Sequence, residues 1–273
     1  MGDPLSLGVD VGASLAKLAL RDGDGVRHEL LPVAPFDRVA ERVAKLAPRT
    51  LGLTGAGASE LARRVDGESV RVTEFAAWGA GVRRLLAAQR PDVTEPYLLV
   101  SLGTGTSVLL AQGMGVSRVG GTALGGGTVM GLGGLLLEGA SFEEISRLAA
   151  QGDRRRVDLL VSDIYRPGEI ALLGDATAAN FGKPGVHARA AEPADLSHAI
   201  MGLVGENVAL ICAGLAAARG VRRVVYGGST LRGNTTLRDV LGLITAAFGC
   251  EPIFLDGGEF AGALGALELS KGL

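Results

Sequence analysis

Hydrophobic and polar positions follow the same pattern twice along the chain. Each round opens with an apolar strand and a glycine turn, and two further strands follow. The first round predicts strands over Leu5–Val11, Leu15–Leu20 and Val26–Val33. The second predicts strands over Tyr97–Leu102 and Ser107–Gln112 and one near Val116–Gly120. Such a repeat indicates a duplicated architecture.

Helical and strand-like segments alternate after each opening. Apolar residues at helical spacing predict a helix over Phe36–Leu46, and later helices are expected near Ala58–Arg64, 75–89, 195–219 and 235–248. Short apolar runs predict strands at Thr50–Leu53, Val70–Val72, Arg223–Tyr226 and Pro252–Leu255. We therefore expect an α/β fold of two domains, residues 1–93 and 94–273, with a closing helix at about 259–270 and a ligand cleft between the domains.

Composition narrows the class of protein. Hydrophobic residues make up 47% and charged residues 21%, which excludes disorder. Glycine accounts for 43 of 273 residues, and 13 of the 39 residues from Ser101 to Gly139 are glycine. A cluster of this kind indicates backbone brought close to a ligand.

Charge, cysteine spacing and hydropathy argue against nucleic-acid binding, a disulfide framework, a zinc site and a membrane span. The net charge is −2, and the one basic tract, Arg154–Arg156, is interpreted as a solvated helix face, so no nucleic-acid footprint is expected. Cys212 and Cys250 lie far apart in sequence, which argues against a disulfide framework or a zinc site. The apolar stretch Val129–Leu137 is too short to span a bilayer. We expect a cytoplasmic protein that does not enter a membrane.

Two turns, one opening each round, carry candidate phosphate chemistry. In the first, Asp10 ends a strand and precedes Gly12-Ala13-Ser14, so backbone amides can face phosphate oxygens while the carboxylate holds Mg²⁺ directly or through water. An ordinary hairpin with a turn aspartate is the alternative. The second turn, Ser101–Ser107, holds four hydroxyl residues and two glycines.

The third motif runs from Arg118 to Thr128. Its triple glycine, Gly125–Gly127, precedes a helix-like run, which would place backbone amides at a helix N-terminus that attracts anions. Arg118 can hold a carboxylate or phosphate through two oxygens, although a structural surface arginine would look the same. Tyr226–Thr230 forms a weaker glycine turn, suited to close approach by a nucleotide base or sugar.

Candidate general bases are carboxylates, because His28, His187 and His198 are interpreted as structural or solvated. Glu74 follows a short strand and begins a helix. By sequence alone, a favourable acid at a helix start explains it better than a catalytic base.

Together these residues resemble the type II pantothenate kinases of the actin, sugar kinase and heat-shock ATPase superfamily. The likeness runs from Gly8 to Leu267, and its most specific parts are Arg118–Thr128 and Asp175–Gly182. It also includes Thr54-Gly55, Gly152-Asp153-Arg154, Asp158-Leu159, Ile164-Tyr165 and Gly262–Ala266. The resemblance implies duplicated ribonuclease H-like domains and ATP-dependent phosphorylation of pantothenate.

The resemblance also implies residue roles. Glu74 becomes the catalytic carboxylate, which reverses the local interpretation. Thr104, Ser107 and Arg118 become substrate contacts, with Arg118 on the pantothenate carboxylate, and Asp10 becomes the Mg²⁺ residue. The implied ATP contacts are Asp10, Val11, Gly12, Ala13, Ser14, Leu15, Ala16, Lys17, Thr104, Gly126, Gly127, Thr128, Val129, Met130, Phe142 and Ser229.

Other readings stay open at this point. A related amino-sugar kinase would not need Arg118, since a neutral sugar has no carboxylate. A non-catalytic nucleotide or coenzyme A sensor is the other alternative, because Ala13 stands where relatives often have glycine. Family members are dimeric, and the apolar helix over Ala199–Ala218 is either such an interface or a core helix. Coenzyme A or its thioesters regulate some members.

Overall fold

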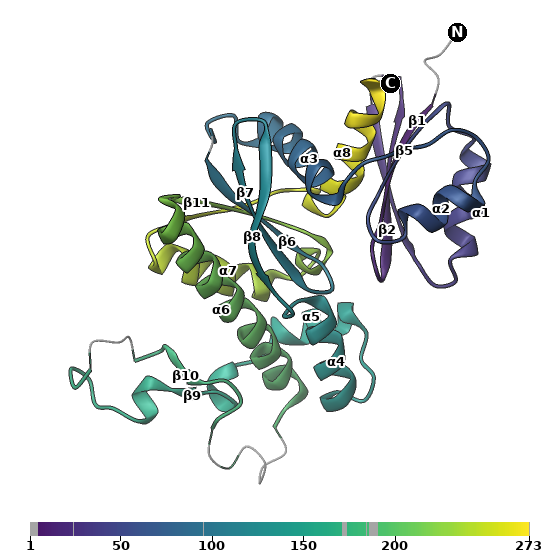
Figure 1. Ribbon diagram of the computed structural model, residues 1–273. Helices are drawn as coiled ribbons and strands as arrows, with labels where there is room; N and C mark the ends of the chain where they lie inside the picture. The colour runs from purple at the N-terminus through teal and green to yellow at the C-terminus, as the bar shows by residue number, and fades with distance from the viewer. Residues whose placement is uncertain are drawn as a thin grey trace.

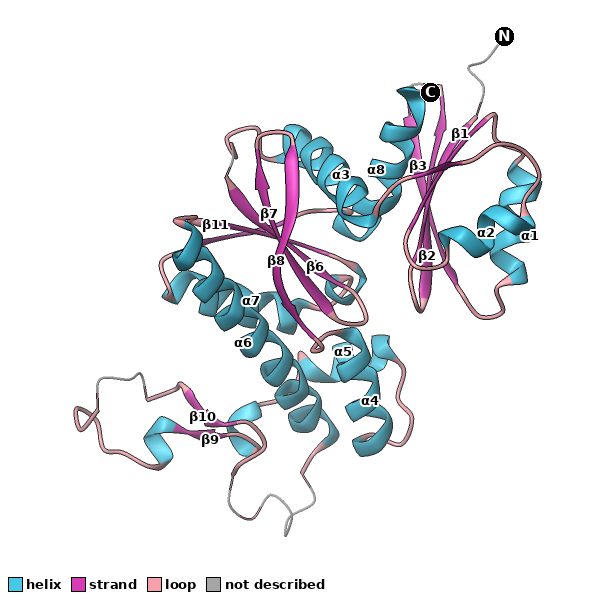
Figure 2. Ribbon diagram, in the orientation of Figure 1, coloured by secondary structure: helices cyan, strands magenta, loops and turns pink. Residues whose placement is uncertain are grey.

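The computed structural model describes residues 5–23, 25–94, 96–170, 174–183, 185 and 191–272. Two five-stranded sheets form the body of the molecule (Figures 1 and 2). The first sheet contains β1 (Ser6–Val11), β2 (Leu15–Asp22), β3 (Gly25–Pro32), β4 (Thr50–Thr54) and β5 (Val70–Arg71). The second contains β6 (Tyr97–Leu102), β7 (Thr106–Gln112), β8 (Gly115–Thr122), β11 (Arg223–Gly227) and β12 (Glu251–Phe254).

The two sheets share one topology. Their orders are β3-β2-β1-β4-β5 and β8-β7-β6-β11-β12. In each, the first three strands are antiparallel, and the last two run parallel to the first strand of the sheet. The repeated order confirms the duplicated α/β architecture predicted from the strand pattern.

Helices cover both faces of the first sheet. α1 (Asp37–Leu46) and α2 (Ala58–Arg64) pack on one face, where Leu7, Val9 and Leu53 are buried. α8 (Ala261–Leu269) packs on the other face. A Cβ on Gly8 would lie 2.1 Å from the carbonyl oxygen of Ala263, so glycine allows this helix to touch the strand backbone.

α3 (Glu74–Gln89) and α8 cross between the two sheets (Figure 1). A Cβ on Gly81 would lie 1.8 Å from the carbonyl oxygen of Ala261, and one on Gly265 would lie 1.7 Å from that of Ala77. The apolar side of α3 joins the core under the second sheet. Each of these two helices therefore packs against the sheet that lies across the predicted boundary at residue 93.

The other face of the second sheet carries four helices. They are α4 (Gly126–Leu136), α5 (Phe142–Ala149), α6 (Pro193–Arg219) and α7 (Thr235–Ala247). α5 was not predicted from the sequence. α6 is long and apolar enough to cross a membrane by composition, but 67% of its most apolar 18-residue stretch is buried in the molecule. Most of α6 is therefore core helix.

An arm formed by residues 154–170 and 174–183 projects from the body beside α6 (Figure 1). It contains β9 (Leu159–Leu160) and β10 (Thr177–Ala179), with short 3-10 turns at Arg154–Arg156 and Val161–Asp163. Further 3-10 turns lie at Ser229–Leu231, Gly258–Phe260 and Ser270–Gly272. Neither arm strand was predicted, because two or three residues give no periodicity.

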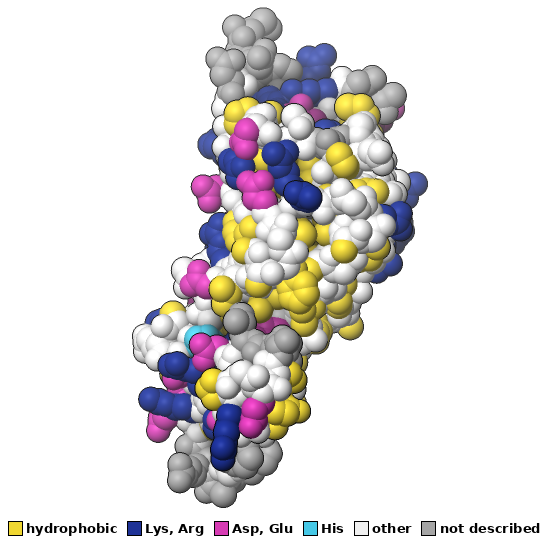
Figure 3. All heavy atoms as spheres, turned by 90° about the vertical axis from the view of Figure 1, so that its left-hand side faces the viewer, with side chains coloured by type: hydrophobic (Ala, Val, Ile, Leu, Met, Phe, Trp, Pro, Cys, Tyr) yellow, Lys and Arg dark blue, Asp and Glu magenta, His cyan; other side chains and the backbone are white. Residues whose placement is uncertain are grey.

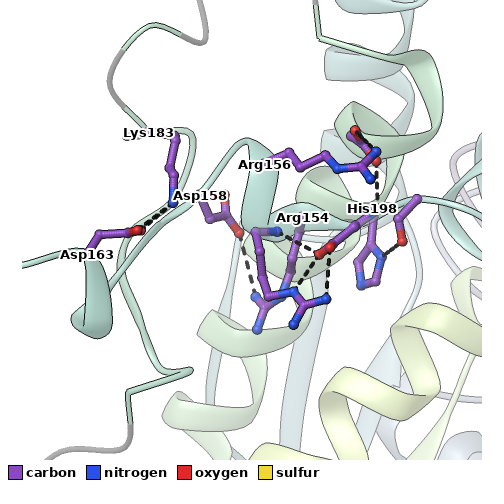
Figure 4. Close-up of polar contacts among 10 residues, drawn as sticks. Arg154, Arg156, Asp158, Asp163, Lys183 and His198 are labelled. Atoms are coloured by element: carbon purple, nitrogen blue, oxygen red, sulfur yellow. Dashed lines mark hydrogen bonds and ion pairs between the residues drawn. The ribbon is translucent and has the colours of Figure 1, made fainter. Parts of the chain in front are cut away.

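The interpretation of Arg154–Arg156 as a solvated helix face is wrong for Arg154. Its side chain is 14% exposed, and its Nη1 lies 2.7 Å from Glu206 Oε1 in α6 (Figure 4). A Cβ on Gly202 in α6 would lie 2.7 Å from Arg154 Nη1, so glycine at this position leaves room for the arginine side chain. Arg155 and Arg156 are exposed, as predicted.

The histidines that the structure describes have structural or surface positions. His198 Nδ1 lies 2.7 Å from the carbonyl oxygen of Gly152 (Figure 4), and the exposed His28 stacks on Phe260 with ring centroids 4.6 Å apart. His187 lies outside the described residues. Both cysteines are free thiols, as expected.

Candidate active site

The two predicted turns meet at one cavity between the sheets. The cavity has a volume of about 360 Å³ and is lined from the first half by Asp10, Gly12–Ser14, Lys17 and Glu74. The second half contributes Ser101, the turn Gly103–Gly105, Ser107 and Arg118. Since β1–β2 and β6–β7 are equivalent hairpins of the repeated sheets, the duplication itself brings these turns face to face.

Asp10 is held in a narrow slot at the end of β1. The residue is 4% exposed, and Lys17 Nζ lies 3.7 Å from its Oδ2. A Cβ on Gly55 would lie 2.6 Å from Oδ1, and one on Gly262 would lie 2.6 Å from Oδ2, so only glycine fits on either side. Burial raises the pKa of the Asp10 carboxyl, and the charge of Lys17 opposes that rise.

Glu74 is the first residue of α3 and reaches the cavity from the side of the first sheet. Partial burial in the cleft, followed by the negative charge of Asp10, raises the pKa of its carboxyl. Among the described residues it has no ion-pair or hydrogen-bond partner. A carboxylate with unused acceptor capacity and a raised pKa is suited to take a proton.

Some backbone amides near the two turns donate hydrogen bonds within the protein, and others do not. Within the described part of the chain, those of Ala13, Ser14, Thr104 and Gly105 donate no hydrogen bond. The predicted helix start at the triple glycine is correct, but the Gly126 and Gly127 amides donate to the carbonyl oxygens of Gly103 and Thr104, at 2.8 and 2.9 Å. They hold the second turn in place, so the prediction that these two amides are free to bind an anion is wrong.

Arg118 lies on β8 and lines the same cavity as Asp10 and Lys17. A Cβ on Gly121 would lie 2.8 Å from Arg118 Nη2, so the guanidinium folds over that glycine. Arg118 forms no ion pair with any carboxylate in the described ranges. A fixed, unpaired cation in a cavity suits an anionic group of a ligand.

A second cavity of about 440 Å³ adjoins the first and is more apolar. The two share Ser14, Leu15, the Gly103–Thr104 turn and Ser229. Its other lining side chains include Met130 and Phe142, as the resemblance implied, and Arg232 and Glu143, which form an ion pair at 3.4 Å. The turn residues therefore stand between a polar and an apolar chamber.

Some of the implied site residues do not line these cavities. Val11, Ala16 and Val129 are fully buried core side chains, and Thr128 Oγ1 accepts a hydrogen bond from the Gly125 amide at 3.3 Å. Conversely, Trp78, Glu259 and Arg232 line the cavities but were not assigned to the site. Trp78 was detectable, because it lies one helical turn after Glu74 on the same side of α3.

The donor set fits a magnesium ion carried by phosphates. Among the residues that the structure describes, no group of three or more His, Cys, Asp or Glu side chains is placed to cage a metal. Asp10 alone offers a buried carboxylate next to the free amides of the first turn. Mg²⁺ commonly binds one carboxylate, water and substrate phosphates, which is what this arrangement supplies.

Comparisons with known proteins show the family of this chain. A family model described as Fumble matches residues 57–268. The chain is also 34% identical over 268 residues to the type II pantothenate kinase of Staphylococcus aureus (strain USA300), covering 98% of this chain and all of that protein. The chain belongs to the type II pantothenate kinase family. The protein of strain RF122 of the same species matches over the same length at the same identity.

Solved structures of more distant proteins share the fold of this pantothenate kinase family member. A ROK family glucokinase from Streptomyces griseus superimposes with a TM-score of 0.67 at 14% identity, covering 98% of this chain and 100% of that one. Component A of (R)-2-hydroxyglutaryl-CoA dehydratase from Acidaminococcus fermentans gives 0.65 at 18% identity, covering 98% of each chain. These likenesses confirm the actin-like, duplicated fold class.

Proposed function

We propose that the protein phosphorylates pantothenate with ATP to give 4′-phosphopantothenate, the first step towards coenzyme A. The observation that carries this proposal is the pairing of an unpartnered carboxylate, Glu74, with an unpaired cation, Arg118, in one cavity beside the phosphate turns. A substrate with a hydroxyl at one end and a carboxylate at the other satisfies both groups. Pantothenate has that chemistry.

In the proposed reaction, Glu74 accepts the proton of the primary hydroxyl. The hydroxyl oxygen then forms a bond to the γ-phosphorus of ATP, and the bond from that phosphorus to the bridging oxygen breaks, which releases ADP. Phosphoryl transfer depends mainly on positioning and charge neutralisation. Lys17 and the free amides of Ala13, Ser14, Thr104 and Gly105 would neutralise phosphate charge.

Magnesium, when bound with ATP, would neutralise further charge on the phosphates, and Asp10 would hold it directly or through water. The buried carboxylate and its glycine slot keep Asp10 from rotating away. The adenine would occupy the apolar cavity beside Met130, Phe142 and Ser229. Ser107 and Arg118 would position pantothenate, with Thr104 between the two ligands.

A homodimer formed through α6 and α7 belongs to the same proposal. Leu210, Leu243 and Phe248 are 46%, 69% and 60% exposed on these helices or directly after them. Figure 3 views the side of the molecule on which α6 and α7 lie, and hydrophobic side chains gather in the middle of that face. Exposed apolar patches of this kind mark interaction surfaces. We place the protein in the cytoplasm, with coenzyme A or its thioesters as candidate regulators.

The test is an ADP-release assay with pantothenate and, in parallel, with neutral amino sugars, each with and without acetyl-coenzyme A. We expect turnover with pantothenate alone among these acceptors. Turnover with an amino sugar but not with pantothenate would contradict the proposal and show that the protein is a sugar kinase. ATP binding without turnover on any acceptor would support a sensor.

A further inference from the structure

The single tryptophan of the chain lines the same cavity as Glu74, and no step of the proposed reaction uses it. Trp78 follows Glu74 by four residues on α3, so about 6 Å, slightly more than one helical turn, separates their positions along the axis. The residue is 4% exposed and still lines the cavity. A small part of the side chain therefore forms the cavity wall, while the rest is fixed in the protein core.

The surroundings of Trp78 hold the indole in one position. It belongs to the core cluster that includes Leu99, Leu109 and Val225 of the second sheet. A Cβ on Gly227 would lie 3.2 Å from Trp78 Cζ3, so the ring edge rests against the backbone at the end of β11. Packed aromatic side chains of this kind change shape little when a ligand binds.

Most other side chains that line the cavity are polar or charged. They include Glu74, Ser101, Ser107, Arg118 and Glu259. The other hydrocarbon side chains in the lining are Ala13, Leu15 and Ala56, which belong to the phosphate turn and to the loop after β4. Trp78 is therefore the one aromatic side chain in the lining of this cavity, and it lies about one helical turn from Glu74.

Pantothenate carries an apolar group at the corresponding place. The carbon that bears its reacting hydroxyl is bonded to a quaternary carbon with two methyl groups. We infer, on the basis of the proposed function, that Trp78 determines specificity by packing against this dimethyl group when Glu74 holds the hydroxyl. Removing methyl groups from a well-packed pocket commonly costs about 10- to 100-fold in kcat/KM.

The experiment compares pantothenate with the analogue in which both methyl groups are replaced by hydrogen. We expect the wild-type protein to favour pantothenate by roughly 10-fold or more in kcat/KM. In Trp78→Ala and Trp78→Leu, the preference should fall below about threefold, mainly through KM for pantothenate, with KM for ATP unchanged. Phe75→Leu is the matched control, because Phe75 packs on the same core cluster without lining the cavity. It should keep the wild-type preference.

Trp78 also reports directly on the wild-type protein, whose fluorescence comes from one indole. Pantothenate should change that emission more than the analogue does at saturation, and this measurement needs no variant. Equal turnover of both substrates by the wild type, or an undiminished preference in folded Trp78→Leu, would overturn the inference alone. No pantothenate turnover by the wild type would overturn the proposed function and this inference together.

Discussion

Two clusters of charged side chains in this molecule contain the same kinds of residue but differ in the contacts that surround them. In the cleft, Lys17 lies near two carboxylates, Asp10 and Glu74. At the root of the arm, Arg154 lies near two others, Asp158 and Glu206. Each set combines one cation with two acids, and one carboxyl group of each set is buried with a raised pKa.

The difference lies in hydrogen bonding. Glu206 accepts hydrogen bonds from Thr177 Oγ1 at 2.8 Å and from Asn180 Nδ2 at 3.3 Å, and Asp158 Oδ1 accepts one from the Phe181 amide at 2.8 Å. The cleft cluster has its closest cation–carboxylate approach at 3.7 Å. In the arm-root cluster, Arg154 Nη1 and Asp158 Oδ2 are buried without a hydrogen bond, but they lie 3.7 Å from each other. Glu74 in the cleft has no hydrogen-bond or ion-pair partner among the described residues, and a polar group without a partner is available to a ligand. The comparison therefore assigns the arm-root cluster to structure and the cleft cluster to chemistry.

Glu74→Gln should give the largest effect. The amide cannot accept the hydroxyl proton, so kcat should fall by about 10²- to 10⁴-fold. Magnesium and ATP should still stabilise the variant against unfolding, because the phosphate turns are unaltered. Near wild-type turnover would remove Glu74 from the catalytic role.

Arg154→Met should destabilise the protein with little effect on turnover by the folded fraction. It leaves Glu206 and Asp158 buried without their cation, which costs about 3–5 kcal/mol. Urea unfolding measures this loss. The control is Arg155→Met, whose side chain is 65% exposed, and it should change stability by less than about 0.5 kcal/mol. Comparable losses in the two variants would contradict a structural role for the arm-root cluster.

Arg118→Met tests the substrate end of the cleft. Losing a charged hydrogen-bond partner commonly costs about 1.5–3 kcal/mol, so KM for pantothenate should rise roughly 10- to 100-fold. KM for ATP should stay the same, and Arg118→Lys should recover part of the loss. An equal rise in both KM values would mean that Arg118 does not single out the acceptor.

The sequence predicted the repeated sheets and the place of the cleft well, because strand alternation and glycine turns are local signals. Glu74 was found only through the family resemblance, since an acid at a helix start has a local explanation. The arm was missed because contacts between Glu206 and residues 154, 177 and 180 hold it in place, and such contacts leave no periodic pattern. The hydrogen bonds that the Gly126 and Gly127 amides donate could not be predicted either, because their acceptors lie more than 20 residues earlier in the chain.

Asp10→Asn should give the smallest change, and its sign is informative. Because burial raises the folded-state pKa of Asp10, its contribution to stability is present below the unfolded value, near 3.8, and is lost as pH rises through the folded value. At neutral pH the buried carboxyl of Asp10 therefore contributes less stability than at low pH, and the neutral amide should raise the free energy of unfolding.

The gain from Asp10→Asn should vanish when unfolding is measured below about pH 4, where the wild-type carboxyl is protonated in both states. Magnesium and ATP should stabilise the wild type more than the variant, because the amide has lost the charge that holds the ion. A variant that is less stable than the wild type at pH 7 would show that the Lys17 pair outweighs burial. The cleft would then resemble the arm-root cluster in its energetics, and only the unpartnered Glu74 would still distinguish the two.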